Sequence, residues 1–533
     1  MASTAVSTDE LGSAVDAIFA TWDREDSPGC AVGVYHKGEV VHARGYGMAS
    51  LELGVPISPA SVFHVASVSK QFCALSVALL AEEGKLSLDD DVRAHVPELP
   101  DFGHTITVRQ LIHHTSGLRD QYGLFRLAGW RDGDAQSNDD VLDFAYRHRR
   151  LNFEPGSQYA YCNTSYTLLA LIVSRVSGVS LREYADEHIF QPLGMTSSAF
   201  VDDRAEIVTG RANAYAPREV DGFKALNSNV DAIGAICLFT SVQDQLRWLK
   251  NLTDRSVAGS VLDAAMTSGV LNDGEATCYG YGMSLESYRG LATVDHGGVD
   301  SGYRAQLTYF PEADFGVVVL ANLSSVKPGA LALQVADVYL ADQLGERGLA
   351  GEPEGQVAEP ELKPLAGIYI QQETRQVRSI EWREDRLVMP TGFGPDLDLT
   401  PLGADRFRLD DPPHELRFRR TTDGPTLLEE ISANGRTLTY TQAEPVTPDS
   451  EELAAYVGSY YCPEIDNTHR IYLHDGRLMI KQRKLPAQAL KPAATDTFVL
   501  PVVGLEFRRD GHGQVTHFEL FNDRIRYLRF ERL

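Results

Sequence analysis

Apolar residues that alternate or run together predict β-strands at two distant places in the chain. The runs at 31–35 and 40–43 flank Lys37-Gly38, which is typical of a hairpin. The runs at 305–309 and 316–320 flank a turn at 311–314 in the same way. We therefore expect one pair of antiparallel strands near residue 35 and another near residue 312.

Between these two pairs the apolar positions follow a helical period. The clearest helical segments are Lys70–Glu83, which ends at Gly84, and then Ser165–Val176 and Val242–Leu252. Strands at both ends with helices between them predict an antiparallel sheet built from both ends of the segment, with a helical subdomain inserted. The predicted fold class of this part is α+β.

Residues 345–363 are rich in Gly, Pro and Glu and predict a linker, after which the helical period is lost. The remaining sequence contains a tandem repeat, because three pairs of matching residues each lie 91 residues apart: Gly367 and Gly458, Arg386 and Arg477, and Phe407 and Phe498. Two repeats with many short strands predict two small antiparallel β-barrels. The expected domains are residues 10–344, the linker, and barrels at 364–447 and 448–533.

The charge of the chain limits which partners it can bind, and its cysteine content indicates its cellular compartment. With 49 Lys and Arg against 74 Asp and Glu, the formal net charge is −25, which argues against nucleic acid and anionic membranes as partners. The six cysteines show no Cys-x-x-Cys spacing, which fits reduced thiols in a cytoplasmic protein. The start of the chain, Met1–Gly12, lacks the basic and apolar regions of a secretory signal. We expect a cytoplasmic protein.

The first candidate for chemistry is Ser67-Val-Ser-Lys70 at the start of a predicted helix. Residues three apart share a helix face, so the Lys70 amine can reach the Ser67 hydroxyl. Unpaired N–H groups at a helix start stabilise an alkoxide or a nearby oxyanion. Lys70 can act as a base only if burial and cationic neighbours lower its pKa. The alternative is a capping serine followed by a surface lysine.

A second match, Ser324-Ser-Val-Lys327, is followed at once by Pro328-Gly329 and predicts a surface loop.

Two further motifs fit the same chemistry. Tyr161-Cys-Asn163 precedes a predicted helix, where the phenol could relay a proton and the carboxamide could bind Lys70 and substrate. His296-Gly-Gly298 lies on a predicted strand, where the glycines would let substrate approach and the histidine could donate to it. The alternatives are a buried tyrosine with a helix-capping asparagine, and a structural histidine.

Taken in this order, the three motifs resemble those of the penicillin-binding protein and serine β-lactamase superfamily, in its class C-like branch. They are separated by 94 and 135 residues, and the resemblance covers roughly residues 10–340. Four further phrases are similar to the same branch, namely 111–118 (LIHHTSGL), 153–156 (FEPG), 192–195 (PLGM) and 281–283 (YGM). The overall plan, a catalytic domain followed by two barrels, most resembles that of the D-aminopeptidases.

The resemblance implies a β-lactamase-like catalytic domain and assigns a role to each motif. Ser67 would be the acylated nucleophile, and Lys70 and Tyr161 would share general-base and general-acid duty. Backbone N–H groups of Ser67 and Val299 would form the oxyanion hole beside Gly298, while Asn163 and His296 would orient the substrate. No class A-type deacylating glutamate can be assigned. No metal or organic cofactor is expected, since His113, His114 and the other histidines lack metal-ligand spacing.

The sequence departs from the lactamase pattern where His296-Gly-Gly298 replaces Lys-Thr-Gly. In this it is similar to D-aminopeptidases, D-amino-acid amidases and some esterases of the superfamily. In D-aminopeptidase a loop of the last barrel restricts the site, whereas here the matching region, Leu500–Gly504, predicts a tight turn. The prediction is a serine hydrolase of D-amino-acid amides or peptides. Its alternatives are a carboxylesterase, an acyltransferase or peptide cyclase, and a penicillin-binding sensor that acylates without turnover. The expected partner is a small-molecule or peptide substrate. The two barrels are candidates for shaping the site, for binding a polymer or for forming a homodimer.

Overall fold

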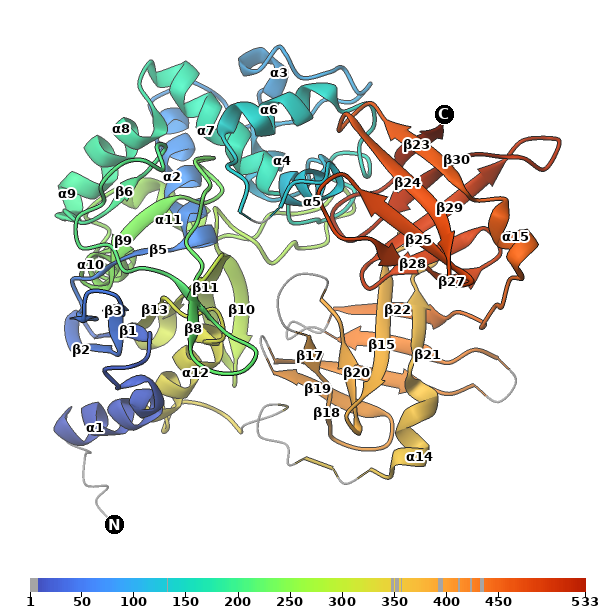
Figure 1. The fold of residues 1–533 in the computed structure, drawn as a ribbon. Coiled ribbons are helices and arrows are strands. Elements are labelled where there is room, and N and C mark those ends of the chain that lie inside the picture. The colour runs from blue at the N-terminus through green and yellow to red at the C-terminus, as the bar shows by residue number, and fades with distance from the viewer. Residues whose placement is uncertain are drawn as a thin grey trace.

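The computed structural model describes residues 8–131, 133–346, 349, 354–355, 357–391, 396–410, 413–421, 424–431 and 436–533. A mixed α/β part, drawn in blue, green and yellow in Figure 1, lies beside two β-barrels drawn in orange and red. The residues Met1–Ser7 and part of the predicted linker, at 347–348, 350–353 and 356, lie outside the described residues. The described end of that linker contains the short helix α14 (Glu359–Leu362).

A six-stranded antiparallel sheet forms the base of the α/β part, with strand order β10-β11-β12-β13-β1-β2. Within this sheet β1 pairs with β13, so that Cys30 lies opposite Ala321 although they are far apart in sequence. This pairing confirms the predicted sheet assembled from both ends of the segment. The strands are β1 (Cys30–His36), β2 (Glu39–Tyr46), β10 (Ser284–Tyr288), β11 (Leu291–Asp300), β12 (Tyr303–Phe310) and β13 (Phe315–Ala321).

Helices cover both faces of this sheet. On one face Val32 and Val34 of β1 share a buried cluster with side chains of α1 (Thr8–Phe19) and α12 (Pro328–Tyr339). On the other face α10 (Val242–Asp254) lies so close that a Cβ on Gly33 would be 2.5 Å from Val242 Cγ1. Both faces of β1 are therefore buried by helices, and the glycine at position 33 allows α10 to approach its face closely.

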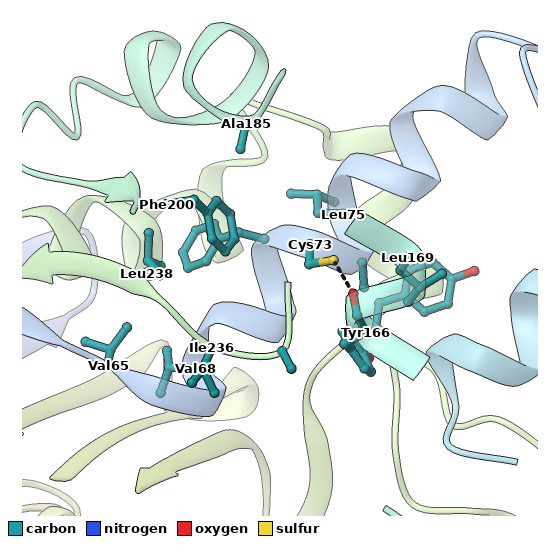
Figure 2. Close-up of a cluster of buried hydrophobic side chains, with 14 of the residues drawn as sticks. Val65, Val68, Cys73, Leu75, Tyr166, Leu169, Ala185, Phe200, Ile236 and Leu238 are labelled. Atoms are coloured by element: carbon teal, nitrogen blue, oxygen red, sulfur yellow. Dashed lines mark hydrogen bonds between the residues drawn. The ribbon is translucent and has the colours of Figure 1, made fainter. Parts of the chain in front are cut away.

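The helical subdomain is built around α2 (Ser69–Glu82) and α7 (Asn163–Ser177). Their contact is apolar, as Figure 2 shows, and it also includes a hydrogen bond in which Cys73 Sγ donates to the Tyr166 carbonyl (3.6 Å). Both helices confirm the predicted helical segments with shifts of one or two residues. Shorter helices complete the subdomain: α3 (Val92–His95), α4 (Val108–Ile112), α5 (Gln121–Leu127), α6 (Asn138–Arg147), α8 (Leu181–Ala185), α9 (Gln191–Leu193) and α11 (Gly259–Ala265).

Short strands connect the subdomain to the sheet. They are β3 (Met48–Ser50), β4 (Val55–Pro56), β5 (Val62–His64), β6 (Ala199–Phe200), β7 (Tyr215–Pro217), β8 (Phe223–Ala225) and β9 (Leu238–Ser241). Within the described residues no single helix is both long and apolar enough to cross a membrane. One pair of consecutive helices, Asn163–Ser177 and Leu181–Leu193, is together long and apolar enough to cross a membrane, but the two helices are bent by 80° relative to each other.

The two barrels repeat one topology. Each is a nearly closed nine-stranded antiparallel sheet, and the order β17-β16-β15-β14-β22-β21-β20-β19-β18 recurs as β26-β25-β24-β23-β31-β30-β29-β28-β27. The same hydrogen bond recurs in both, because Tyr369 Oη donates to the Leu365 carbonyl and Tyr460 Oη to the Tyr456 carbonyl, each at 2.8 Å. These features confirm the predicted pair of antiparallel barrels.

The first barrel consists of β14 (Gly367–Ile370), β15 (Val377–Arg383), β16 (Arg386–Met389), β17 (Leu397–Asp398), β18 (Thr400–Pro401), β19 (Arg406–Asp410), β20 (Pro413–Arg419), β21 (Leu427–Ile431) and β22 (Thr437–Gln442). After α15 (Ser450–Ala454) the second consists of β23 (Gly458–Cys462), β24 (Asn467–His474), β25 (Arg477–Gln482), β26 (Gln488–Ala489), β27 (Lys491–Ala494), β28 (Thr497–Leu500), β29 (Val503–Arg509), β30 (Val515–Phe521) and β31 (Leu528–Arg532).

The second barrel and the helical subdomain share one hydrophobic core. Phe125 of α5 and Phe144 of α6 belong to the same buried cluster as Phe518 and Leu528 of the barrel. Polar contacts reinforce the junction, since Asn467 Nδ2 donates to the Leu127 carbonyl at 2.8 Å. Because apolar surface is buried continuously across the junction, this barrel is fixed against the subdomain.

Candidate active site

Ser67 lies in a single turn of 3₁₀-helix, Ala66–Val68, directly before α2. Ala66 has φ +47°, a left-handed conformation that is costly for a residue with a Cβ. Ser67 is only half-buried, whereas the neighbouring Ser69 is fully buried and donates to the Ala66 carbonyl. Ser69 therefore holds the turn together, and Ser67 is the serine that stays partly accessible to solvent.

The side chain of Lys70 is fully buried, which rules out the alternative of a surface lysine. Its Nζ atom lies 3.0 Å from Ser67 Oγ, 2.8 Å from Asn163 Oδ1 and 2.8 Å from the Ala235 carbonyl oxygen. Burial lowers the pKa of Lys70 to about 7, although the negative charge of Asp120 acts in the opposite direction. An amine with this pKa is partly neutral at physiological pH and is able to accept a proton.

Asn163 is the first residue of α7, and Tyr161 lies two residues before it. Burial raises the pKa of Tyr161 above its usual range, while a hydrogen bond with Ser67 partly opposes that shift. The Lys70 amine lies 4.9 Å from the centre of the Tyr161 ring. Four residues singled out from two sequence motifs, Ser67, Lys70, Tyr161 and Asn163, therefore meet at one point.

His296 approaches the same point from β11. Its ring centre lies 6.1 Å from that of Tyr161, its Nε2 atom lies 2.9 Å from Tyr279 Oη, and its Nδ1 atom lies 2.6 Å from the Gly297 carbonyl oxygen. Burial, assisted by the positive charge of Lys70, lowers the pKa of His296 to about 3, so the ring is neutral near pH 7. A neutral ring supplies shape and polarity to the site, and no net charge.

Strand β11 is pressed against the segment that carries Ser67. A Cβ on Gly298 would be only 2.2 Å from the Val65 carbonyl oxygen, so glycine is required at that position. The side chain of the next residue, Val299, is 68% exposed and points away from the buried residues of the site. Val299 therefore adjoins the segment of Ser67 through its backbone and not through its side chain.

Aromatic rings and histidines surround the pair of Ser67 and Lys70. The His114 ring centre lies 4.3 Å from that of Tyr161, and His114 Nδ1 accepts the Cys162 N–H. His113 Nδ1 contacts the Tyr279 carbonyl oxygen at 2.9 Å. Among the residues that the structure describes, no three His, Cys, Asp or Glu side chains are grouped so that they could hold a metal ion.

Comparison with known proteins agrees with this geometry. A family model described as Beta-lactamase matches residues 15–340, which is more than half of the chain. The chain belongs to the Beta-lactamase family. As a member of this family with full-length peptidase relatives, the protein is a serine hydrolase. A second model, described as a domain of unknown function (DUF3471), matches residues 442–532 and so covers the second barrel.

Relatives of this Beta-lactamase family member extend over nearly its whole length. A D-aminopeptidase of Gluconobacter oxydans is 28% identical, with 92% of this chain and 90% of the relative covered. Among solved structures, the octameric penicillin-binding protein homologue from Pyrococcus abyssi has a TM-score of 0.58 at 24% identity, covering 82% of this chain and all of the other. The D-amino acid amidase from Ochrobactrum anthropi SV3 has a TM-score of 0.53 at 21% identity, covering 63% of this chain and 99% of the other. These structural likenesses show the fold.

Two residues of this Beta-lactamase family site were missing from the sequence prediction. Asp120 follows the LIHHTSGL phrase by two residues and binds Asn163, and Arg524 reaches the Tyr161 ring from the second barrel. The segment Leu500–Gly504 is a tight turn between β28 and β29, as predicted. The part of this barrel that reaches the site is instead the later loop Asn522–Tyr527, between β30 and β31.

Proposed function

We propose that the protein hydrolyses amides or peptides of D-amino acids through an acyl-enzyme on Ser67. The observation that carries the proposal is the contact of 3.0 Å between Ser67 Oγ and the Lys70 amine, whose pKa is lowered to about 7. A buried amine with this pKa can remove the serine proton at neutral pH. The D-amino-acid preference is supported by full-length relatives named D-aminopeptidase.

In the acylation step neutral Lys70 takes the Ser67 proton, and Oγ attacks the carbonyl carbon of the substrate. The negative charge that develops on the carbonyl oxygen is stabilised by the backbone N–H groups of Ser67 and Val299. Tyr161 then gives its proton to the leaving nitrogen and recovers one from protonated Lys70, so that the amine departs neutral. In deacylation water replaces the amine, and the same groups move the proton in reverse.

Asn163 and His296 position the substrate in this proposal. The Asn163 amide is held by Asp120 on one side and contacts Lys70 on the other. Both ring nitrogens of His296 are engaged within the protein, so His296 shapes the floor of the site next to Gly298 rather than transferring a proton. This assignment also explains why a histidine with a pKa of about 3 is compatible with activity.

Two further aspects of the protein belong to the proposal. A cytoplasmic location is supported by six free cysteines, five of them buried, since reduced thiols are typical of that compartment. Self-association, of which a homodimer is the simplest form, is supported by the structural neighbour described as octameric.

The test uses purified protein with D-alanine p-nitroanilide, its L-isomer and p-nitrophenyl acetate, followed by absorbance and intact mass. We expect D-selective anilide turnover, loss of that turnover in Ser67→Ala, and retention in Ser324→Ala, which changes the second Ser-x-x-Lys match. Ester turnover alone would replace the proposal with an esterase. A stable acyl adduct without turnover would replace it with a penicillin-binding sensor, and a new amide product would indicate an acyltransferase.

A further inference from the structure

The loop Asn522–Tyr527 of the second barrel is fixed against the catalytic part by its backbone. The Arg524 carbonyl accepts from the Asp120 N–H (3.3 Å) and from Asn152 Nδ2 (2.9 Å), and Asn152 Oδ1 accepts the Arg526 N–H (2.8 Å). Ile525 is fully buried and packs so closely on Gly123 that a Cβ there would be 2.5 Å from Ile525 Cδ1. The loop is therefore held in one position, and so is the start of the Arg524 side chain.

The guanidinium of Arg524 lies over the Tyr161 ring, 4.9 Å from its centre. The Arg524 side chain is exposed to solvent. Among the residues that the structure describes, no hydrogen bond or ion pair engages this guanidinium. A fork of N–H donors is thus presented to the solvent beside the proposed general acid.

The two nearest acidic side chains, Asp523 and Asp120, make no hydrogen bond or ion pair with this guanidinium, although the negative charge of each stabilises it. The Asp523 carboxylate is turned to the first barrel, where it accepts from Arg378 at 3.0 Å. The Asp120 carboxylate is occupied by three N–H groups, two from Asn163 and one from Tyr122. Lys70 lies at the same Tyr161 ring and adds positive charge there only in its protonated form. The Arg524 guanidinium, which no side chain of the described residues binds through a hydrogen bond or ion pair, is therefore the group that favours an anion at this place.

We propose that Arg524 binds a carboxylate carried by the leaving group of the substrate. The inference rests on the proposed function, in which Tyr161 protonates the leaving nitrogen. In an α-amino acid that nitrogen and the carboxylate carbon are only about 2.5 Å apart, so a group at the Tyr161 hydroxyl places its carboxylate near the guanidinium. The planar fork of arginine matches a carboxylate with two parallel hydrogen bonds. The substrates are then short peptides whose scissile bond precedes a free carboxyl-terminal residue.

The test compares two substrates that differ only in this charge, D-Ala-D-Ala and D-Ala-D-Ala amide, at one pH. We expect wild type to favour the free acid, and we expect the ratio of the two kcat/KM values to fall about 10- to 100-fold in Arg524→Met. Arg524→Lys keeps the charge without the fork and should give an intermediate ratio. Using a ratio cancels any effect of Arg524 on the pKa of Lys70, which acts on both substrates.

Arg529→Met is the matched control, because Arg529 lies on β31 of the same barrel, is exposed and pairs with Glu531. Its ratio should equal that of wild type, and melting curves establish that all variants fold. An unchanged ratio in Arg524→Met, or a wild type that prefers the amide, would overturn the inference while D-alanine p-nitroanilide turnover leaves the proposed function standing. A wild type that cleaves none of these substrates would overturn both.

Discussion

One carboxylate oxygen of Asp120 accepts both the backbone N–H and the side-chain N–H of Asn163, each at 2.7 Å. The two bonds fix the orientation of the Asn163 amide, so that its oxygen faces the Lys70 amine at 2.8 Å. Asp120 thus acts on Lys70 through Asn163 and also directly through its charge. This makes Asp120 a positioning residue for the lysine.

Replacing Asp120 with asparagine should both slow the reaction and move its pH dependence. Without the carboxylate, Asn163 loses its charged anchor, and we expect kcat/KM to fall about tenfold or more. The negative charge that raises the pKa of Lys70 is also lost, so the midpoint of the acidic limb should move below about 7. The check is a pH profile with p-nitrophenyl acetate. Asp101→Asn, at an exposed position, should match wild type, and a slower Asp120 variant with an unmoved midpoint would reduce Asp120 to a structural role.

The pH profile of the wild-type protein should report Lys70. Because the amine must be neutral to accept the serine proton and its pKa is lowered to about 7, kcat/KM should rise with pH and level off above about pH 8. His296, with a pKa near 3, stays neutral over that range and adds no limb. Activity that declined as the pH passed through 7 would show that Lys70 is not the base. Steady-state rates from pH 5 to 9 settle the point.

Two adjacent glycines of β11 should respond very differently to an added methyl group. In Gly298→Ala the new Cβ would meet the Val65 carbonyl oxygen at 2.2 Å, so β11 must move away from the Ser67 turn and activity should fall about 100-fold or more. In Gly297→Ala the nearest atom is the end of the Gln306 side chain at 3.1 Å, which can rotate away. Turnover of the Gly297 variant should stay within a few-fold of wild type. Equal losses in the two variants would contradict the close approach of β11.

A buried ion pair should hold the second barrel in place. Arg119 is fully buried, pairs with Glu464, and donates to the carbonyls of Arg526 (3.1 Å) and Tyr527 (3.2 Å). Arg119→Met leaves Glu464 buried without its charged partner, with only the Arg149 N–H still donating to it, and we expect the apparent free energy of unfolding in urea to fall by about 3–5 kcal/mol. Activity should fall too, because the loop of Arg524 loses the two carbonyl contacts that Arg119 makes with it.

The control for this pair is Arg24→Met, which removes a fully exposed pair with Asp26 and should leave the urea midpoint unchanged. A double-mutant cycle with Glu464→Met then separates the pair from the two carbonyl contacts of Arg119. If Arg119→Met unfolded at the wild-type midpoint, the shared apolar core and the other polar contacts would hold the barrel without help from this ion pair.

The elements that could be predicted are those encoded within a short stretch of sequence. Helix α2 follows from its apolar period and from Gly84, whose φ of +71° ends it. The barrels follow from residues that both copies share, such as Gly367 and Gly458. Asp120 and Arg524 could not be found this way, because the role of each depends on a partner brought near only by folding. Arg524 and Tyr161 are separated by 363 residues, so no local sequence pattern could indicate that they come into contact.

The contact between Arg524 and Tyr161 also sets an order of events during synthesis. Arg524 follows Lys70 by 454 residues, so at about 5–20 residues per second it leaves the ribosome roughly 20–90 seconds later. During that interval the serine, the lysine and the tyrosine have all been synthesised, whereas Arg524 has not. The nascent chain therefore passes through a stage in which it has its nucleophile but lacks the arginine proposed to bind the substrate carboxylate. On this proposal, preference for substrates with a free carboxylate arises only when the second barrel has folded.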